Sequence, residues 1–339
     1  MNKRIEGIDY LRAIMSVFVV IWHMGGGGRS LIFSMKDFRQ HTFTFSDFVN
    51  FHLLLLAVPA FILVSNYLYV SREITYKAFQ KRMKRLLLLL SFWAPILIVV
   101  RYLYTGQLDI IPDSISSFIV ILLRAGNTKY YFFVSLILTL LFTHSISKLK
   151  PAILIPGFIL SIIFIAFLPL LTKIYGYYQL SAYWNPLNFI PYCFAALLIK
   201  GNEDNILSKK YYILVTSFSL FFIFSIIEWN ASTGAIFFPG QGFAIPAYTR
   251  TSLIFGTLTL LIFALDPKIK SGKIVSFMSK YSLALYCLHP FLMEPVSYII
   301  NLLINDTVIA RCLSIFFVII FSYLLAAIFK KHFREELLT

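Results

Sequence analysis

The sequence is poor in charged residues and in cysteine. Only 13% of its 339 residues are Asp, Glu, Lys or Arg, whereas 59% are hydrophobic, and the mean hydropathy is +0.80. Soluble domains carry about 25% charged residues, so this composition excludes an ordinary water-soluble fold. Cys193, Cys287 and Cys312 lie in apolar segments without CxxC spacing. We therefore expect no disulfide framework and no metal site, and we interpret these cysteines as packing residues.

Acidic residues are scarcer than basic ones, 15 against 30, which gives a net charge of +15. The Lys and Arg residues form short clusters between apolar runs, a pattern typical of membrane topology and headgroup contacts rather than of nucleic-acid binding. The sequence contains no Walker loop, dinucleotide fingerprint, HExxH or GxSxG. ATPase, dehydrogenase, zinc protease and serine hydrolase chemistry are therefore unsupported, and no nucleic-acid partner is expected.

Apolar segments of about 20 residues, the length that a transmembrane helix requires, recur along the chain. Ten candidates are found, at 8–28, 48–70, 86–104, 130–147, 151–170, 187–199, 211–228, 249–265, 274–299 and 309–329. With a cytoplasmic N-terminus, the inner segments carry 19 Lys and Arg residues and the outer side carries 9, as the positive-inside rule expects. We predict an all-α, polytopic membrane protein with about ten transmembrane helices, both termini cytoplasmic, and a single domain over 1–339 without an appended soluble domain.

Three segments need a separate interpretation. The stretch 114–123 is apolar but too short to span, so we expect an interfacial or re-entrant helix on the outer side. The span at 187–199 is short, and the flanking Pro186 and Pro191 could break it. The N-terminus resembles a signal peptide, but Asp9 and Arg12 interrupt its apolar run, so we interpret it as a retained first helix.

Arg12 and His23 lie inside this first apolar stretch with no charged residue between them. Eleven residues at 100° per residue bring the two side chains within roughly 20° of each other on a helix, about 16 Å apart along the axis. Such groups within a membrane helix are costly unless they face a polar cavity or a partner, which favours a functional pair. The alternative is that Arg12 snorkels to the interface and His23 only packs.

His23 and His289 are expected at similar depth, each about 15 residues, or roughly 22 Å, from the cytoplasmic start of its span. Arg12 then lies near the inner surface. This arrangement suits a donor bound inside and an acceptor approached from outside, with histidine as the general base and arginine as a ligand for phosphate. For His289, which precedes Pro290, a kinked helix whose histidine bonds a backbone carbonyl freed by the proline is an equally good interpretation.

The loop from Arg72 to Arg85 concentrates cations at Lys77, Lys81, Arg82, Lys84 and Arg85. Topology and anionic headgroups explain it most simply, and the phosphates of a nucleotide-bearing donor are the alternative. His52 and His144 lie near predicted span ends, at water interfaces, and are not expected to be catalytic. Asp9, three residues before Arg12, is expected to pair with it.

These segments together resemble the bacterial membrane-bound acyltransferase-3 family. Gly7 to Ile14 followed by His23 looks like the opening signature of that family, with ten residues between the Arg and the His. Val58 to Leu68 is similar to its second-span segment, although Asn66 stands where glycine is usual. Three further segments follow in the family's order, namely the basic loop, an aromatic segment at Lys129–Leu136 and a pattern ending in His at Tyr281–Phe291.

The resemblance implies a multi-pass O-acyltransferase of the bacterial cytoplasmic (inner) membrane. Its donor would be a cytoplasmic acyl-CoA, usually acetyl-CoA, and its acceptor a hydroxyl of a cell-surface or lipid-linked glycan. By this resemblance His23 and Arg12 are the essential catalytic pair, and no metal is expected. We place the CoA phosphates on Arg12 with Lys81, Arg82 or Arg85. Further candidates for substrate binding are Asp9, Ser65, Tyr131 and His289.

Some family members carry an extracytoplasmic esterase-like domain, and none is expected here. The protein would then act alone or with a separate extracytoplasmic partner. A transporter or export component for a glycan or small molecule is the alternative function, because broken helices and buried polar residues fit both. Release of free CoA from acetyl-CoA in the presence of an acceptor distinguishes the two.

Overall fold

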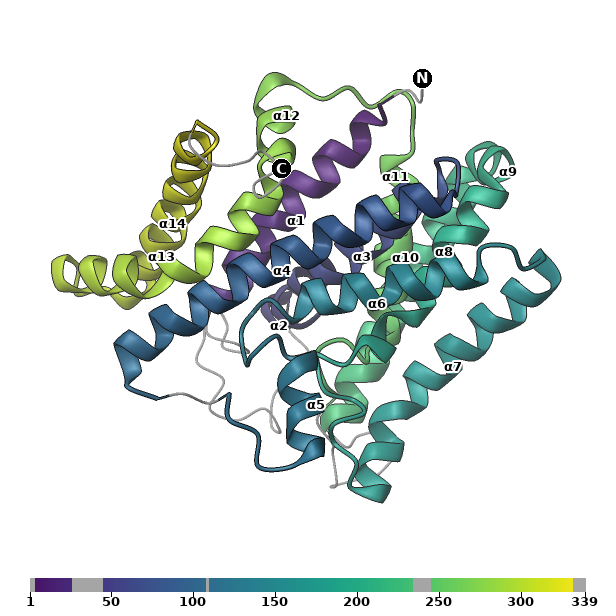
Figure 1. Ribbon diagram of the computed structural model, residues 1–339. Coiled ribbons are helices and arrows are strands. Elements are labelled where there is room, and N and C mark those ends of the chain that lie inside the picture. Colours follow the sequence, from purple (N-terminus) through teal and green to yellow (C-terminus); the bar gives the residue numbers. More distant parts are fainter. Residues whose placement is uncertain (1–3, 26–44, 108–109, 234–244, 332–339) are drawn as a thin grey trace.

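The computed structural model describes residues 4–25, 45–107, 110–233 and 245–331, which form helices joined by turns (Figure 1). These ranges contain no strand, so the all-α prediction is confirmed for them. The helices are α1 (Glu6–Met24), α2 (Phe45–Phe48), α3 (Ala57–Val70), α4 (Tyr76–Thr105), α5 (Ile115–Leu123), α6 (Tyr131–Ile146), α7 (Pro151–Tyr175), α8 (Ile190–Gly201), α9 (Glu203–Ser208), α10 (Lys210–Thr233), α11 (Thr251–Ala264), α12 (Lys273–Lys280), α13 (Ser282–Leu303) and α14 (Thr307–Phe329). A π-helical turn (Val49–Leu53) and 3-10 turns (Leu54–Leu56 and Pro186–Phe189) complete the helical structure.

Seven helices in the described ranges are long and apolar enough to cross a membrane. They comprise α1, the continuous segment Val49–Val70, α4, α7, α10, α13 and α14. Three shorter apolar helices, Tyr131–Ile146, Pro186–Gly201 and Thr251–Ala264, lie where three further spans were predicted. The protein is therefore a multi-pass membrane protein, whereas the count of ten spans and the side of each terminus stay predictions.

The ends of the long helices follow from their local sequence. Thr75 caps α4 by accepting a hydrogen bond from the Ala78 N–H at 3.2 Å, and Gly106 ends this helix in the left-handed conformation with φ 67°. Helix α7 opens on Pro151, whose missing N–H is not needed in a first turn, and it ends at Gly176 with φ 73°. Both helices expose large apolar side chains along their length, as lipid-facing helices do.

The predicted span 274–299 is wrong in its start. The chain forms the short helix α12, breaks at Tyr281, and continues as α13 from Ser282. The physical reason is that α12 is amphipathic and directs Ser276, Ser279 and Lys280 into a polar pocket, so it does not belong to the apolar span. The predicted short helix at 114–123 forms as α5, and the prolines at 186 and 191 give a 3-10 turn that leads into α8.

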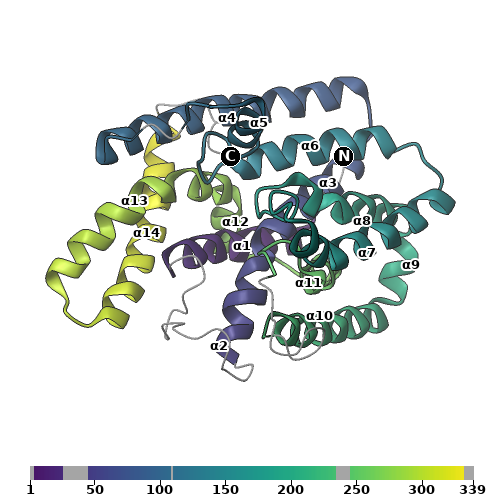
Figure 2. The same ribbon diagram turned by 90° about the horizontal axis from the view of Figure 1, so that it is seen from below.

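Helix α1 lies at the centre of the bundle. It contacts α3, α11, α12, α13 and α14. Figure 2 shows α1 between the α13–α14 hairpin on one side and the helices α8 and α10 on the other. A residue on α1 can therefore meet partners from distant parts of the sequence.

Gly7 allows α1 to approach α11 closely. A Cβ atom at this position would lie 2.1 Å from the Ala264 carbonyl oxygen, which is far inside van der Waals contact. Because the obstacle is backbone at the end of α11, rather than a flexible side chain, it cannot move aside without shifting a helix. This glycine of the opening signature therefore has a packing role.

We expect Gly7→Ala to destabilise the protein, since the added methyl group must separate α1 from α11. The control is Gly201→Ala, because a Cβ at Gly201 meets nothing within 4 Å. Thermal unfolding in detergent should show a lower Tm for Gly7→Ala by several degrees, corresponding to about 1–3 kcal/mol of overpacking, and little change for Gly201→Ala. Equal Tm values for the two variants would contradict the close contact.

Candidate active site

Two histidines from distant parts of the chain meet between α1 and α13. The rings of His23, in the last turn of α1, and His289, in the second turn of α13, stack with centroids 5.3 Å apart and planes 22° apart. His289 is fully buried and His23 is partly exposed. The expectation that the two imidazoles lie at similar depth is therefore met by direct contact.

Hydrogen bonding fixes the proton on His289. Its Nδ1 lies 3.1 Å from the Leu285 carbonyl oxygen, which can only accept, so Nδ1 is the donor and Nε2 carries the lone pair. The kinked-helix interpretation expects a bond to the carbonyl freed by Pro290, which is that of Tyr286, whereas the observed acceptor is the carbonyl of Leu285, one residue earlier. Nε2, however, is buried and has no hydrogen-bond partner among the described residues. The ring is thus held in one tautomer beside His23, with an unused acceptor.

Lys129, in the turn before α6, lies against the same face of α13. Its carbonyl oxygen accepts a hydrogen bond from the Tyr286 hydroxyl, and its Nζ lies 3.0 Å from the Met293 sulfur. Tyr286 precedes His289 by three residues and Met293 follows it by four, so the three share one helix face. The charge of Lys129 interacts with both imidazoles.

Sequence reasoning counted Lys129 as an outer-side charge and as the first residue of the aromatic segment Lys129–Leu136, and it missed this contact. The one available signal was a single lysine directly before an aromatic run, Tyr130 to Phe133. Burial lowers the pKa of Lys129 from 10.5 to about 8, against the opposing effect of Glu294. A cation of this kind is close to its point of proton loss near neutral pH.

Arg12 lies toward the other end of α1 and lines a pocket of about 450 Å³. The other residues of this pocket are Arg4, Asp9, Ser276, Phe277, Ser279 and Lys280. Arg12 makes no hydrogen bond or ion pair within the part of the chain that the structure describes. Its charge interacts with those of Arg82 and Arg85 from α4. The pocket therefore combines an unpaired guanidinium with further cations, a composition suited to an anion.

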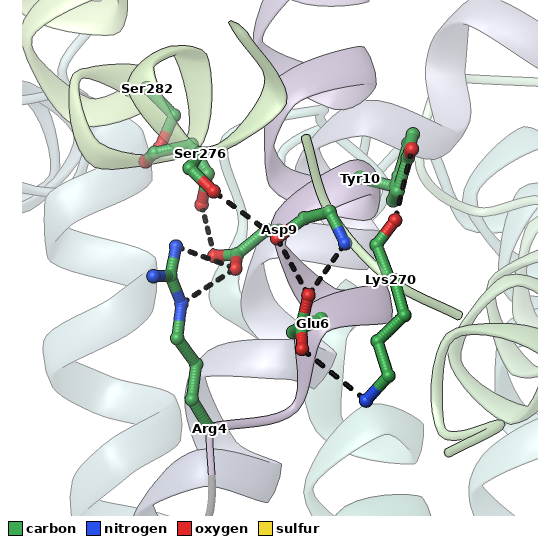
Figure 3. Close-up of polar contacts among 9 residues, drawn as sticks. Arg4, Glu6, Asp9, Tyr10, Lys270, Ser276 and Ser282 are labelled. Carbon is green, nitrogen blue, oxygen red and sulfur yellow. Dashed lines mark hydrogen bonds and ion pairs between the residues drawn. The ribbon is translucent and has the colours of Figure 1, made fainter. Parts of the chain in front are cut away.

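The expected Asp9–Arg12 pair is wrong. Asp9 Oδ2 accepts from Arg4 (Figure 3), with both Nε and Nη2 at 2.8 Å. Asp9 Oδ1 accepts from the Ser279 hydroxyl at 2.7 Å. A spacing of three residues on one helix allows an Asp9–Arg12 pair. The carboxylate is instead bonded to Arg4, which precedes α1, and to Ser279 from α12. Arg12 is left available as a result.

The remaining predicted site residues are only partly brought together. The Arg82 guanidinium donates from Nη2 to both the carbonyl and the hydroxyl oxygen of Ser65, each at 2.7 Å, so it is partly used in holding α4 to α3. Lys81 and Arg85 are exposed. Tyr131 is buried, and its hydroxyl donates a hydrogen bond to the Tyr248 hydroxyl at 3.3 Å. This bond directs the Tyr131 hydroxyl to Tyr248 and not to His23 or His289.

The expectation that His52 lies at a water interface is wrong, because this residue is fully buried. Its Nδ1 lies 3.1 Å from the Ser252 hydroxyl oxygen and 3.6 Å from Glu228 Oε2, and Nε2 lies 3.5 Å from Arg250 Nη1. Its partners come from α10 and from the start of α11, and the sequence around residue 52 does not predict these contacts. His144 bonds the Tyr69 hydroxyl at 2.7 Å and stacks on Phe79.

The family model described as an acyltransferase domain, that of acyltransferase-3, matches residues 5–327. The chain belongs to the acyltransferase-3 family. Membership identifies the protein as an acyltransferase of the membrane O-acyltransferase kind. No curated protein and no solved structure matches this acyltransferase significantly.

The lowered pKa of Lys129 gives the acyltransferase a pH-dependent stability. The folded state binds fewer protons at this site than the unfolded state between about pH 8 and 10.5, so the contribution of Lys129 to stability rises with pH across that window. Below pH 8 the cost of burying the ammonium applies in full. We therefore expect Lys129→Met to raise Tm at pH 7.5, and the gain to shrink by pH 9.5.

The measurement is thermal unfolding in detergent at the two pH values. Lys148→Met, which removes an exposed lysine between α6 and α7, is the matched control and should show no such pH trend. A gain for Lys129→Met that is the same at both pH values would contradict a lysine that deprotonates near pH 8.

Proposed function

We propose that this protein transfers an acyl group, most simply acetyl, from acyl-CoA on the cytoplasmic side to a hydroxyl of a cell-surface or lipid-linked glycan. The setting is the bacterial inner membrane. The observation that carries the proposal is that α1 presents an unpaired arginine in a cationic pocket at one end and a histidine stacked on a second histidine at the other. A donor with phosphates and an acceptor with a proton to lose fit these two ends.

The pocket end supports a phosphate-bearing donor. A guanidinium binds phosphate through two parallel charge-assisted hydrogen bonds, and Arg12 has none of its own within the described residues. Arg4 and Lys280 line the same pocket, whose carboxylate, Asp9, is already neutralised by Arg4. The site as a whole is therefore positive. We assign the phosphates of CoA to this pocket. Arg85, an exposed arginine whose charge interacts with that of Arg12, would contribute to binding them.

The histidine end supports proton transfer. His23 is partly exposed, and its ring makes no hydrogen bond within the described residues, so its nitrogens are available to a substrate. His23 removes the proton from the acceptor hydroxyl, whose oxygen attacks the thioester carbonyl carbon. The C–S bond then breaks, and the protonated His23 returns the proton to the CoA thiolate. Stacking on His289 keeps the ring of His23 in place during these steps.

Removal of the base should abolish transfer. Purified protein in liposomes, given acetyl-CoA and a glycan acceptor, is assayed for free CoA and for acylated product. We expect His23→Ala to lower the rate by about 100-fold to 10,000-fold, the usual worth of a positioned general base. His23→Phe keeps an aromatic ring against His289 but has no nitrogen, and should be equally inactive while matching wild type in membrane yield. Retained acylation in His23→Phe would remove His23 from catalysis.

Arg12→Ala should weaken donor binding. A hydrogen bond to a charged group contributes about 1.5–3 kcal/mol, so we expect Kd for acetyl-CoA to rise by about 10-fold to 100-fold. Binding is measured by calorimetry on the protein in detergent. Lys148→Ala, which removes an exposed lysine between α6 and α7, is the control and should bind as wild type does. Unchanged binding in Arg12→Ala would assign Arg12 a structural role.

A further inference from the structure

The turn that carries Lys129 is held in an unusual backbone conformation. Three successive residues, Ala125, Gly126 and Asn127, have positive φ angles of 49°, 70° and 60°. The left-handed region is unfavourable for a residue other than glycine, and it persists only where surrounding contacts fix it. Here the Thr128 hydroxyl donates to the Ala125 carbonyl at 2.8 Å and accepts from the Tyr130 N–H at 3.2 Å.

The same turn is fastened to α13 on both sides of the histidine. The Tyr130 hydroxyl donates to the Cys287 carbonyl at 2.6 Å, and the Tyr286 hydroxyl donates to the Lys129 carbonyl. Together with the contact between Lys129 Nζ and Met293, these bonds lay the lysine along the turn of α13 that holds His289. The position of the ammonium relative to the histidine pair is therefore fixed by backbone contacts rather than by a flexible side chain alone.

The ammonium group of Lys129 is poorly satisfied. It has three N–H donors, and its one acceptor within the described residues is the Met293 thioether, a weak acceptor. Glu294 is the acidic residue whose charge acts on Lys129, but its side chain is exposed and forms no ion pair with the ammonium. A lysine with a purely structural role at such a place would be expected to reach a carboxylate or a carbonyl.

We propose that Lys129 is the electrophile of the acyl transfer, donating a hydrogen bond to the oxygen of the thioester carbonyl as that oxygen becomes negative. This inference rests on the proposed function. His23 takes the acceptor proton, the acceptor oxygen bonds to the carbonyl carbon, and the electron pair of the C=O bond moves to the oxygen beside Lys129. The pair returns as the C–S bond breaks, and the thiolate receives the proton from His23. Lys129 keeps its own proton throughout.

The pH dependence follows from the groups around the lysine. The titratable side chains that face it are His23 from α1, His289, Tyr286 and Glu294 from α13, and Tyr130 of its own turn. The pKa of Lys129 is lowered to about 8, so turnover in wild type should fall as pH rises above that value. A guanidinium stays protonated throughout the range of the assay.

The experiment compares wild type, Lys129→Met, Lys129→Arg and the exposed-lysine control Lys148→Met in liposomes with acetyl-CoA and a glycan acceptor, from pH 6.5 to 9.5. We expect Lys129→Met to lose about 100-fold to 1,000-fold in kcat, the usual cost of removing one oxyanion donor, with KM for acetyl-CoA changed by less than about threefold. Lys129→Arg should retain part of kcat and lose the decline above pH 8. Lys148→Met should behave as wild type does.

The outcomes separate the two proposals. If wild type releases no CoA, the proposed function fails and the assignment of Lys129 fails with it. If wild type is active and Lys129→Met keeps its kcat, or Lys129→Arg keeps the same decline above pH 8, the role of Lys129 alone is overturned. Folding of each variant is checked by its Tm in detergent, where Lys129→Met should be at least as stable as wild type at pH 7.5.

Discussion

Helix α1 places polar groups at several levels along its length inside a largely apolar bundle, and such groups need partners in place of water. The segment from residue 264 to 293 provides most of them. Glu6 accepts from the Ser271 N–H at 2.7 Å, and Asp9 accepts from the Ser279 hydroxyl. His23 stacks on His289 at the other end of the helix. The close approach at Gly7 brings α1 against the end of α11, from which this segment continues. Helix α1 and the segment 264–293 together thus define both ends of the candidate active site.

The break at Tyr281 has a functional consequence in this arrangement. A continuous helix over 274–299 would keep the serines of α12 and the histidine of α13 on one straight axis. The break allows α12 to contribute Ser276, Ser279 and Lys280 to the pocket around Arg12 while α13 turns His289 toward His23. Arg12 and His23 are about 16 Å apart along α1. The proposed donor, a CoA thioester, carries its phosphates and its acyl group far apart, so binding at one end of α1 is compatible with reaction at the other.

The sequence predicted what depends on helical periodicity and on hydropathy. The shared face of Arg12 and His23 follows from 100° per residue, and the apolar helices follow from segment length. Contacts between residues of different helices could not be predicted, because they depend on how the chain runs between those helices. The spacing predicted that Asp9 pairs with Arg12 on the same helix, yet Arg4 and Ser279 are the partners of its carboxylate. Lys129 was counted as an outer-side charge, whereas its contact with α13 depends on how the left-handed turn at Ala125–Asn127 packs against that helix. His52, near a predicted span end, is buried because Phe48 stacks on it and α10 and α11 supply its polar partners.

The cluster around His52 contains a serine, a histidine and a carboxylate, but its hydrogen-bond directions argue against a second reaction centre. The Ser252 hydroxyl donates to Glu228 at 2.6 Å, so its oxygen accepts from His52 Nδ1. His52 therefore donates a hydrogen bond to the serine oxygen and is not placed to remove the hydroxyl proton, and its Nε2 faces Arg250. A nucleophilic serine needs the opposite direction. The cluster instead joins the end of α10 to the start of α11. Arg250 also lies over the ring of Phe51, which contacts Trp22 beside His23. The cluster around His52 thus supports the end of α1 that carries His23.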